Sequence, residues 1–370
     1  MNYDLLPAGE STDQLPRPRA DPTALALAGQ VANAYAARDL FGDYRARKAA
    51  NTLRQQDGGL ALFADYLSAA GIPNPPAARD LAGAPAAWTG VTWGLVSKFR
   101  DWLLTRGYAI GSVNLHLTTL RTYAGLAMQA RVIPAGECAA IRAVRGYGRT
   151  EGKHVDSART PTRKGAKKAR PVSLTLEQAA RLKAQPDTPQ GRRDALLLCL
   201  LLDHGLRVGE VAGLAVRDFD LAAGELRFYR PKVDKIQTHR LTADTLAAAW
   251  AYLSSDVRSA ASSMSSGDIT DASSAQGPVL RASRKGGALQ DAGMTARALT
   301  ARVHDLGAAV GLVGLSAHDL RHYWATRAAR SGTPLDRLQD AGGWASPAMP
   351  LRYVESAKIA NQGVLLDAPA

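Results

Sequence analysis

A basic segment without apolar periodicity divides this chain of 370 residues. Residues 142–170 hold ten Lys or Arg and two acidic residues, a net charge of +8, and they are rich in Gly, Thr, Ser and Pro. Such a composition does not form a packed core, so a domain is expected on each side of it. We interpret residues 146–171 as an interdomain linker that follows the phosphates of DNA, with a plain solvated spacer as the alternative.

The charge of the whole chain also favours a polyanionic partner, because the net charge is +13 and the sequence pI is about 9.9. If about six to ten phosphates are neutralised, the affinity should fall by roughly 10³ to 10⁵ between about 50 and 200 mM salt. The basic side chains that we expect to contact DNA are Arg121, Arg145, Arg149, Lys164, Lys167, Lys168 and Arg170.

Other protein classes are disfavoured by what the sequence lacks. The longest apolar run, residues 195–202, is eight residues, which is far too short to span a membrane. The first residues show no basic flank followed by an apolar stretch, so no secretory signal is expected. Cys138 and Cys199 form no Cys-x-x-Cys pair and are interpreted as small core residues. We expect a cytoplasmic, nucleoid-associated protein without a membrane partner.

The part before the linker is expected to be helical. Residues 1–41 are interpreted as a flexible segment with a possible helix at about 23–38, and residues 42–145 as a helical domain. Apolar residues at helical spacing predict helices at about 46–70 and 90–106, and a third that begins with Ser112 as its N-cap. Polar and basic helix faces are typical of domains that face DNA, but an ordinary helical bundle fits these helices equally well.

The part after the linker, residues 172–370, predicts helices around a small β-meander. Thr175 and Gln178 match a capping box that opens a helix to about residue 184, and residues 195–202 predict a buried helix. Residues 226–229 and 237–241 predict two strands. We interpret residues 230–236 between them as a turn that is too polar for a core, and residues 254–276 as a flexible Ser/Ala/Gly loop.

The C-terminal region is punctuated by helix signals. Ser316 and Asp319 match a capping box, so Asp319 is expected to serve the helix start, and His318 and Arg321 should share one face of that helix. Gly-Gly at 342–343 should end a second helix, and Ser-Pro at 346–347 should open a third. Pro350 should make this last helix begin late or kink, because it lacks a backbone N–H.

Six residues in these regions form a series with a fixed order. They are Arg207 in Gly-Leu-Arg-Val-Gly-Glu, Lys232 in the turn, His318 and Arg321 in His-x-x-Arg, and Trp344 and Tyr353 in Trp-x8-Tyr. This series resembles the active-site residues of the tyrosine recombinases, the phage-integrase family. The resemblance covers about residues 42–360. It implies a mainly α protein with a helical core-binding (SAM-like) domain and an α+β catalytic domain.

Two positions depart from the family pattern. Trp344 stands where the family more often has His, a variant that some members use. Lys235 follows Lys232 in the same turn, and we prefer Lys232 as the catalytic lysine because the family usually places it first after the strand.

The resemblance assigns each residue type a role in attack on a phosphodiester. Tyr353 would be the nucleophile and His318 its base, because an unperturbed phenol is only about 0.1% ionised at pH 7. Arg207 and Arg321 would stabilise the charge on the phosphate, where another enzyme would use a metal ion. Lys232 would protonate the leaving 5′-oxygen.

The remaining candidates would support these groups. Trp344 would donate an indole N–H to the phosphate or pack against the helix of the nucleophile. Glu210 would be a partner of Arg207, or else a surface acid, and His322 would lie beside the reacting groups. His318 and His322 also have the spacing of a metal pair, but no third ligand is suggested, so no metal and no cofactor are expected.

The series therefore predicts a site-specific DNA recombinase or integrase that works through a covalent 3′-phosphotyrosyl intermediate without metal or ATP. A type IB topoisomerase-like strand transferase and an inactive DNA-binding homologue are the alternatives. The resemblance implies three kinds of partner: a double-stranded recombination site, further copies of the chain in a tetramer, and accessory DNA-bending proteins. The segment after Tyr353 would dock on a neighbouring copy or pack on its own chain.

Overall fold

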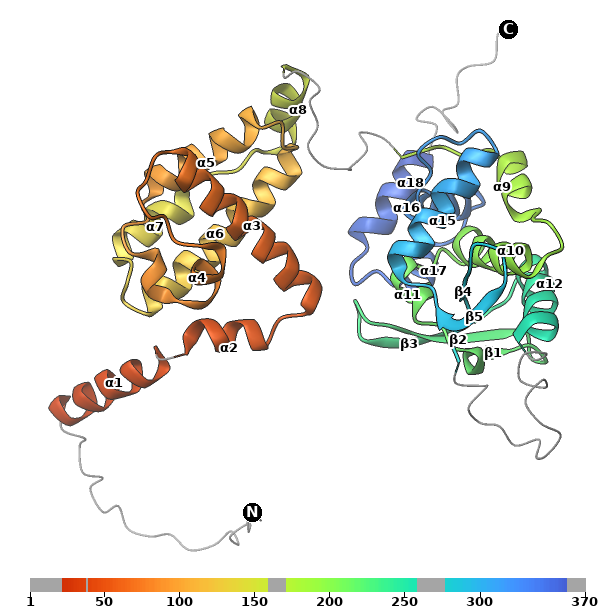
Figure 1. Cartoon of the computed structure of the whole chain (residues 1–370), viewed down its shortest axis with the longest axis horizontal. Coiled ribbons are helices and arrows are strands. Elements are labelled where there is room, and N and C mark those ends of the chain that lie inside the picture. Colours follow the sequence, from red (N-terminus) through yellow and green to blue (C-terminus); the bar gives the residue numbers. More distant parts are fainter. Residues whose placement is uncertain (1–21, 38, 159–170, 258–276, 358–370) are drawn as a thin grey trace, which may run out of the picture. The chain divides into compact units, whose positions relative to one another are not determined.

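The computed structural model describes residues 22–37, 39–158, 171–257 and 277–357. The chain forms two compact units, Met1–Lys167 and Lys168–Ala370, and each is described here by itself (Figure 1). Within the described ranges, the longest apolar helical stretch falls short of what a bilayer crossing requires. The predicted 254–276 loop and the tail after residue 357 lie largely or wholly outside these ranges.

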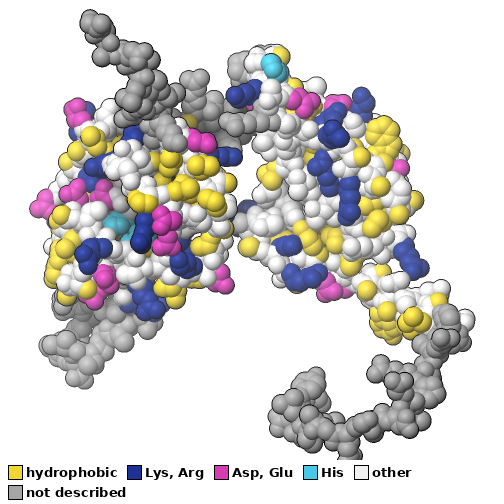
Figure 2. All heavy atoms as spheres, turned by 180° about the vertical axis from the view of Figure 1, so that it is seen from behind, with side chains coloured by type: hydrophobic (Ala, Val, Ile, Leu, Met, Phe, Trp, Pro, Cys, Tyr) yellow, Lys and Arg dark blue, Asp and Glu magenta, His cyan; other side chains and the backbone are white. Residues whose placement is uncertain are grey.

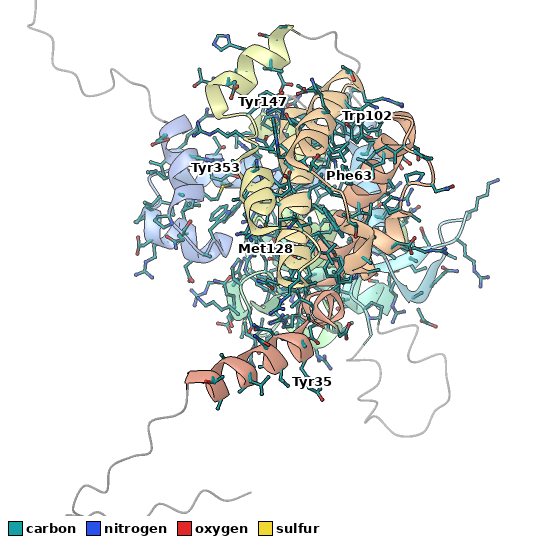
Figure 3. The ribbon with its side chains drawn as sticks, turned by 90° about the vertical axis from the view of Figure 1, so that its left-hand side faces the viewer. Tyr35, Phe63, Trp102, Met128, Tyr147 and Tyr353 are labelled. Atoms are coloured by element: carbon teal, nitrogen blue, oxygen red, sulfur yellow. The ribbon has the colours of Figure 1, made fainter. Side chains whose placement is uncertain are left out.

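The first unit is a bundle of helices. Its elements are α1 (Pro22–Ala36), α2 (Leu40–Ala46), α3 (Ala50–Ala69), α4 (Ala78–Gly83), η1 (Pro85–Trp88), α5 (Trp93–Thr105), α6 (Ile110–Gln129), α7 (Ala135–Ala143) and α8 (Arg149–Ala158). Aromatic side chains fill the core: Phe63 (Figure 3), Trp88, Phe99 and Tyr123 are fully buried, and the Phe63 and Phe99 rings meet edge to face at 5.2 Å. The expectation of a helical unit is confirmed.

Two details of this unit differ from the sequence interpretation. Helix α6 begins at Ile110 with Ala109 as its N-cap, so Ser112 is not the cap and lies in the first turn. Ile110 is buried, which explains why the helix includes it. Helix α8 occupies part of the segment that we interpreted as linker, and the rest of that segment from residue 159 to 170 lies outside the described residues.

The second unit combines helices with two small antiparallel sheets. Its elements are α9 (Leu176–Lys183), α10 (Pro189–Leu202), α11 (Val208–Ala212), η2 (Val216–Asp218), β1 (Phe219–Asp220), β2 (Glu225–Arg230), β3 (Lys235–Arg240), α12 (Ala243–Tyr252), η3 (Leu253–Val257), β4 (Arg281–Ser283), β5 (Leu289–Gly293), α15 (Ala296–Ala309), α16 (Ala317–Arg330), α17 (Leu335–Gly342) and α18 (Ala348–Ala357). The β1-β2-β3 sheet confirms the predicted β-meander, whereas the β4-β5 pair was not predicted.

Helix α10 is the centre of the second unit. Residues 196–202 are all buried, as expected for a helix that is apolar on every side. Helices α9, α12 and α16 pack against it, and α16 in turn contacts α17 and α18 (Figure 1). The core therefore holds α16, which carries the His-x-x-Arg motif, beside the helix that carries Tyr353.

The β2–β3 hairpin corrects the sequence interpretation of residues 230–236. Strand β2 continues through Arg230, which pairs with Lys235 across the hairpin, so Pro231 lies in the turn and does not end the strand early. The burial of β2 alternates, and Leu226, Phe228 and Arg230 face inward. Arg230 is completely buried, so the segment that we considered too polar for a core places an arginine inside it.

The helix signals of the C-terminal region act largely as predicted. The Asp319 carboxylate accepts hydrogen bonds from the backbone N–H and the hydroxyl of Ser316, at 2.8 and 2.7 Å. Gly343 ends α17 in the left-handed region with φ of 57°, where a side chain would be strained. Helix α18 begins at Ala348, so Pro350 is its third residue. The N–H that Pro350 lacks would have no helical partner there, and no kink is needed.

Candidate active site

The corner between α17 and α18 gathers the arginines of the motif series. The last carbonyls of a helix have no partner within the helix and carry the negative end of its dipole. Here the Gly342 carbonyl accepts a hydrogen bond from Nη2 of Arg321 at 2.6 Å, and the Gly343 carbonyl accepts one from Nη2 of Arg207 at 3.0 Å. Two guanidiniums from distant helices are thus fixed on one turn of backbone, directly before Trp344.

Arg321 is buried by the groups that hold it. Its Nη1 donates to the Gly205 carbonyl, and its guanidinium carbon lies 4.5 Å from the centre of the Trp344 ring, a cation–π contact. Burial, together with the positive charge of Arg207, lowers the pKa of Arg321 to about 10, so the side chain remains protonated at pH 7. Arg321 is therefore a rigid, weakly hydrated cation.

Glu210 is shared by two arginines. Its Oε1 accepts from Nη1 of Arg207 at 2.7 Å, and its Oε2 accepts from Nη1 of Arg230 at 2.9 Å. The backbone N–H of Arg207 also donates to Oε2 at 2.8 Å, so the carboxylate caps α11 as well. Glu210 is buried, which places it as the partner of Arg207 and not as a surface acid.

Tyr353 lies on α18 (Figure 3) and packs against His322 and Trp344. Only 4% of the residue is exposed, and its ring centre lies 4.8 Å from that of His322 and 5.6 Å from that of Trp344. Burial raises the pKa of the Tyr353 phenol, and the positive charges of Arg321, Arg352 and Arg207 act in the opposite direction. The phenol is therefore neutral at pH 7 but sits in a field that favours its anion.

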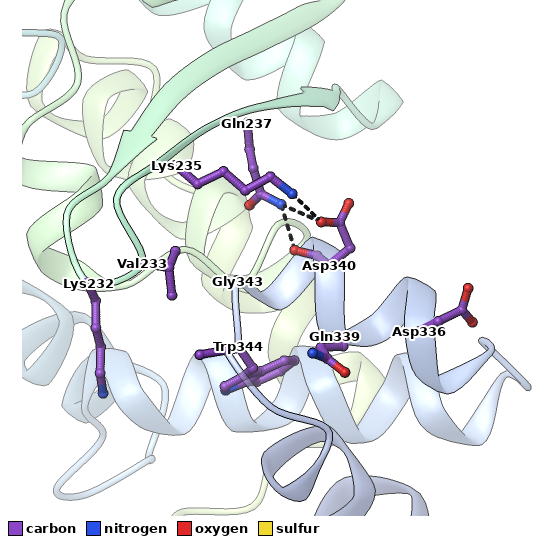
Figure 4. A pocket seen from close by; sticks show the side chains of 10 residues that line it. Lys232, Val233, Lys235, Gln237, Asp336, Gln339, Asp340, Gly343 and Trp344 are labelled. Carbon is purple, nitrogen blue, oxygen red and sulfur yellow. Dashed lines mark hydrogen bonds and ion pairs between the residues drawn. The ribbon is translucent and has the colours of Figure 1, made fainter. Parts of the chain in front are cut away.

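The ammonium groups of the two lysines of the β2–β3 hairpin have different surroundings. Both line a cavity of about 510 Å³ together with Gly343 and Trp344. Lys235 forms an ion pair with Asp340 at 2.7 Å, whereas Lys232 extends separately on the side of Trp344 (Figure 4). Among the described residues, Lys232 is exposed and has no ion pair or hydrogen bond, so its ammonium is available to a bound anion.

His318 and His322 lie one turn apart on α16. The exposed His318 ring is centred 6.4 Å from that of His322, and His322 is the ring that packs on Tyr353. Burial and the neighbouring His318 lower the pKa of His322, so this imidazole is neutral at pH 7. Over the described ranges there is no group of three His, Cys, Asp or Glu that could hold a metal ion.

The basic residues proposed to contact DNA have mixed surroundings. In the first unit, Arg121 and Arg145 line a hollow with Arg142 and Tyr147, but the Arg121 guanidinium also donates to the Val144 carbonyl. On the face shown in Figure 2, basic side chains form a column on this unit with few acids among them. Arg149 begins α8, its side chain is not described, and Lys164, Lys167, Lys168 and Arg170 lie outside the described residues.

Sequence reasoning missed Arg230. It lies at the centre of the site, bonded to Glu210 and to the last turn of α17. A signal was present, because Arg230 continues the alternation of Leu226 and Phe228 on the inward face of β2. The Pro that follows it concealed this pattern by indicating a strand end.

Two neutral histidines behind the hairpin make stability depend on pH. Burial lowers the pKa of His204 to about 4 and that of His239 to about 3, the second also through the charge of Arg230. Below pH 6.5 the unfolded chain binds protons that the folded chain does not, so the unfolding free energy should fall as the pH decreases from about 6.5 towards 4. For His204 this amounts to about 3 kcal/mol.

A His204→Gln protein should lose part of this dependence. Urea unfolding at several pH values between about 4.5 and 7.5 measures it, with exposed His304→Gln as the control. If the unfolding free energy of the His204 variant depends on pH as steeply as that of the wild type, another group causes the acid sensitivity.

The model of the phage integrase family matches residues 173–359, just over half of the chain. The chain belongs to the phage integrase family. The matched segment includes every member of the motif series, from Arg207 to Tyr353.

Curated relatives of this integrase-family chain include two tyrosine recombinases. XerC of Pelobacter propionicus is 31% identical over 185 residues, which cover 50% of this chain and 55% of the relative. XerD of Neisseria meningitidis serogroup B is 29% identical over 201 residues, covering 53% and 62%. The match thus spans little more than half the length of these relatives.

Solved structures show that the fold is shared more widely. The Tn1549 transposon integrase in complex with transposon right end DNA has a TM-score of 0.56 at 15% identity, covering 85% of this chain and 93% of that one. A lambda integrase dimer bound to a COC′ core site has a TM-score of 0.54 at 14% identity, covering 89% and 96%. At these identities the likeness concerns the fold.

Proposed function

We propose that this protein is a site-specific DNA recombinase that cuts and rejoins strands through a covalent phosphotyrosyl intermediate. The observation that carries the proposal is the position of Tyr353, packed on Trp344, which also covers the Arg321 guanidinium. A phenol and two fixed guanidiniums lie around Trp344 and the end of α17, and Lys232, which has no ion pair or hydrogen bond among the described residues, lines a cavity with Trp344. These are the groups that the reaction needs, and they come from four separate elements of the second unit.

The proposed cleavage step is a direct displacement at phosphorus. The Tyr353 oxygen attacks the scissile phosphate, its proton passes to His318 as general base, and the bond from phosphorus to the 5′-oxygen breaks. Lys232 supplies a proton to the leaving 5′-oxygen. A 5′-hydroxyl of a partner strand reverses the sequence, so the ester is conserved and no ATP is consumed.

Charge in the site supports this assignment. The buried Arg230 and Arg321 and the partly buried Arg207 form a cluster with the carboxylate of Glu210, which leaves a charge of +2 on these four side chains. Such an excess, fixed before the substrate arrives, favours a phosphate that gains negative charge in the transition state. Trp344 excludes water from one side of Arg321 and so strengthens the interaction of this guanidinium with that charge.

The proposed substrate is double-stranded DNA, bound by both units. Support comes from the net charge of +13, from the basic hollow of the first unit, and from relatives named tyrosine recombinases. The domain roles follow the sequence interpretation: residues 42–145 bind DNA, residues 146–171 connect, and residues 172–370 carry out the chemistry. Assembly into a tetramer and assistance by DNA-bending proteins belong to the same proposal.

The decisive experiment traps the covalent intermediate. The protein is incubated with nicked duplexes that tile the DNA flanking its own coding sequence, so that the short 5′-hydroxyl fragment diffuses away after cleavage. A denaturation-resistant adduct whose peptide map places the DNA on Tyr353 is the expected result. Absence of an adduct on every duplex that the protein binds would overturn the proposal. Relaxation of plasmids without any such site would indicate a topoisomerase-like activity.

Lys232, and not Lys235, is expected to be the general acid. A Lys232→Ala protein should cleave about 100-fold more slowly, because the 5′-oxygen would leave without a proton. Lys235→Ala is the matched control from the same hairpin, since its ammonium is engaged by Asp340. A substrate with sulfur at the 5′ bridging position, whose thiolate leaves without protonation, should restore the rate of the Lys232 variant. If only Lys235→Ala is slow, the assignment is reversed.

A further inference from the structure

Arg230 is one of the most deeply buried charged residues in the described part of the second unit, and the proposed chemistry leaves it unused. Its residue exposure is 0%, and its guanidinium lies 4.7 Å from the centre of the Phe228 ring beneath it. A buried guanidinium is costly to remove from water unless every donor has a partner. The partners of this one therefore indicate why the fold retains it.

All the donors of Arg230 are directed at parts that hold the site. Nη1 donates to Glu210 at 2.9 Å and lies 3.4 Å from the Gly342 carbonyl, and Nη2 donates to the Ala341 carbonyl at 2.7 Å. Nε donates to Gln237, and His239 lies 3.4 Å from Nη2. One side chain thus joins the β2–β3 hairpin, the carboxylate on α11 and the last turn of α17.

Glu210 connects Arg230 to Arg207, because its carboxylate accepts hydrogen bonds from both side chains. The carboxylate oxygen that does not face Arg230 holds Nη1 of Arg207, so Glu210 is fixed from both sides. Without Arg230 the Glu210 carboxylate could rotate, and the Arg207 guanidinium would no longer be held in one orientation. Arg207 meets solvent on one side, being 23% exposed, so it depends on this support more than the buried Arg321 does.

The contacts of Arg230 with α17 hold the end of the helix directly before Trp344. Gly343 packs on the stem of Arg230 so closely that an added Cβ would come within 2.5 Å of Arg230 Cδ. Gln237 reinforces the same turn, because its amide donates to the Asp340 carbonyl at 2.7 Å. The carbonyls that Arg230 holds stand beside those that hold Arg321 and Arg207.

We propose that Arg230 is a positioning residue for strand cleavage, which aims Arg207 through Glu210 and fixes the α17 turn that seats Trp344. The proposal rests on the recombinase function proposed above. Arg230 itself does not touch the phosphate, because it is enclosed by protein on all sides. It acts on the rate through other side chains.

The test compares single-turnover cleavage of a nicked duplex that the wild-type protein cleaves. Arg230→Met should bind this duplex within about threefold of the wild type but cleave it about 100-fold more slowly. Arg193→Met is the control, because Arg193 is equally buried and is paired with Asp194 away from the site. It should cleave at the wild-type rate per folded molecule, as measured by circular dichroism.

A double variant separates positioning from general loss of structure. Because Arg230 acts partly through Arg207, Arg230→Met should slow cleavage clearly less than about 100-fold when it is introduced into Arg207→Ala, and the remaining effect reports the contacts with α17. Multiplying effects would overturn the proposal, as would wild-type cleavage by Arg230→Met. If Arg230→Met does not fold, Arg230→Lys replaces it in the same cycle, because lysine keeps the charge but loses the fork of donors.

The two proposals fail in different ways. If the wild-type protein itself yields no adduct, the recombinase function is wrong. If the wild type yields the adduct and the double variant shows independent effects, only the role of Arg230 is wrong.

Discussion

A Tyr353→Phe protein is expected to form no covalent adduct with DNA while binding it within about twofold of the wild type. The substitution removes only the phenolic oxygen, which is the proposed nucleophile. The phenyl ring can keep its place between His322 and Trp344, whose ring centres lie 4.8 and 5.6 Å away. Loss of a covalent nucleophile costs on the order of 10⁶ in rate, so the adduct should fall below detection.

Tyr323→Phe offers a closely matched control for this experiment. Tyr323 also lies in the second unit, on α16, and its hydroxyl is buried with no hydrogen-bond partner among the described residues. Removing that oxygen should leave both folding and adduct formation intact. A Tyr353→Phe protein that still forms phosphotyrosyl-DNA would refute the assignment of the nucleophile, and peptide mapping would identify the tyrosine that replaces it.

Local sequence patterns predicted most of the helices of the second unit and where several of them begin and end. The capping boxes at Thr175 and Ser316 form as predicted, because each depends on side chains only three residues apart. Gly343 ends α17 because a left-handed residue is needed there. The buried α10 follows from its uninterrupted apolar run. Short-range chemistry of this kind is visible without knowledge of the tertiary structure.

Local sequence patterns do not predict contacts between residues that are far apart in the chain. The Arg207 guanidinium is held by the Gly343 carbonyl, 136 positions later in the chain, and backbone carbonyls have no sequence pattern. The short β4-β5 pair has no strong alternation either. The polar composition of residues 230–236 predicts a turn that begins at Arg230, whereas the alternation of β2 assigns Arg230 to the inward face of the strand.

The proposed site residues were named from motif order, and the structure adds what surrounds them. It distinguishes Lys232 from Lys235 by the Asp340 ion pair, which no spacing could indicate. It also places His322 directly against Tyr353, the proposed nucleophile. The neutral His322 ring can orient the phenol of Tyr353, while the more exposed His318 is the residue proposed above to accept its proton.

Replacing Arg321 by Met is expected to slow DNA cleavage by about 10³-fold. The substitution removes a fixed positive charge at the proposed phosphate site, and a lost donor of this kind costs about 10² to 10³ in rate. It also removes the Arg321 donors from the buried carbonyls of Gly205 and Gly342, and the second carbonyl keeps only the longer contact with Arg230. The unfolding free energy should therefore fall by about 1–3 kcal/mol.

Two further variants separate these effects. Arg302→Met breaks an ion pair with Asp194 elsewhere in the same unit, so it should lower stability without a matching loss of cleavage. Arg321→Lys keeps the charge, but an ammonium cannot donate to two carbonyls in a fixed fork and lie flat on Trp344, so cleavage should remain about 100-fold slow. Single-turnover cleavage and urea unfolding measure both quantities. If Arg321→Lys restores the full rate, charge alone is sufficient, and the guanidinium geometry at the α17 corner is not what the reaction requires.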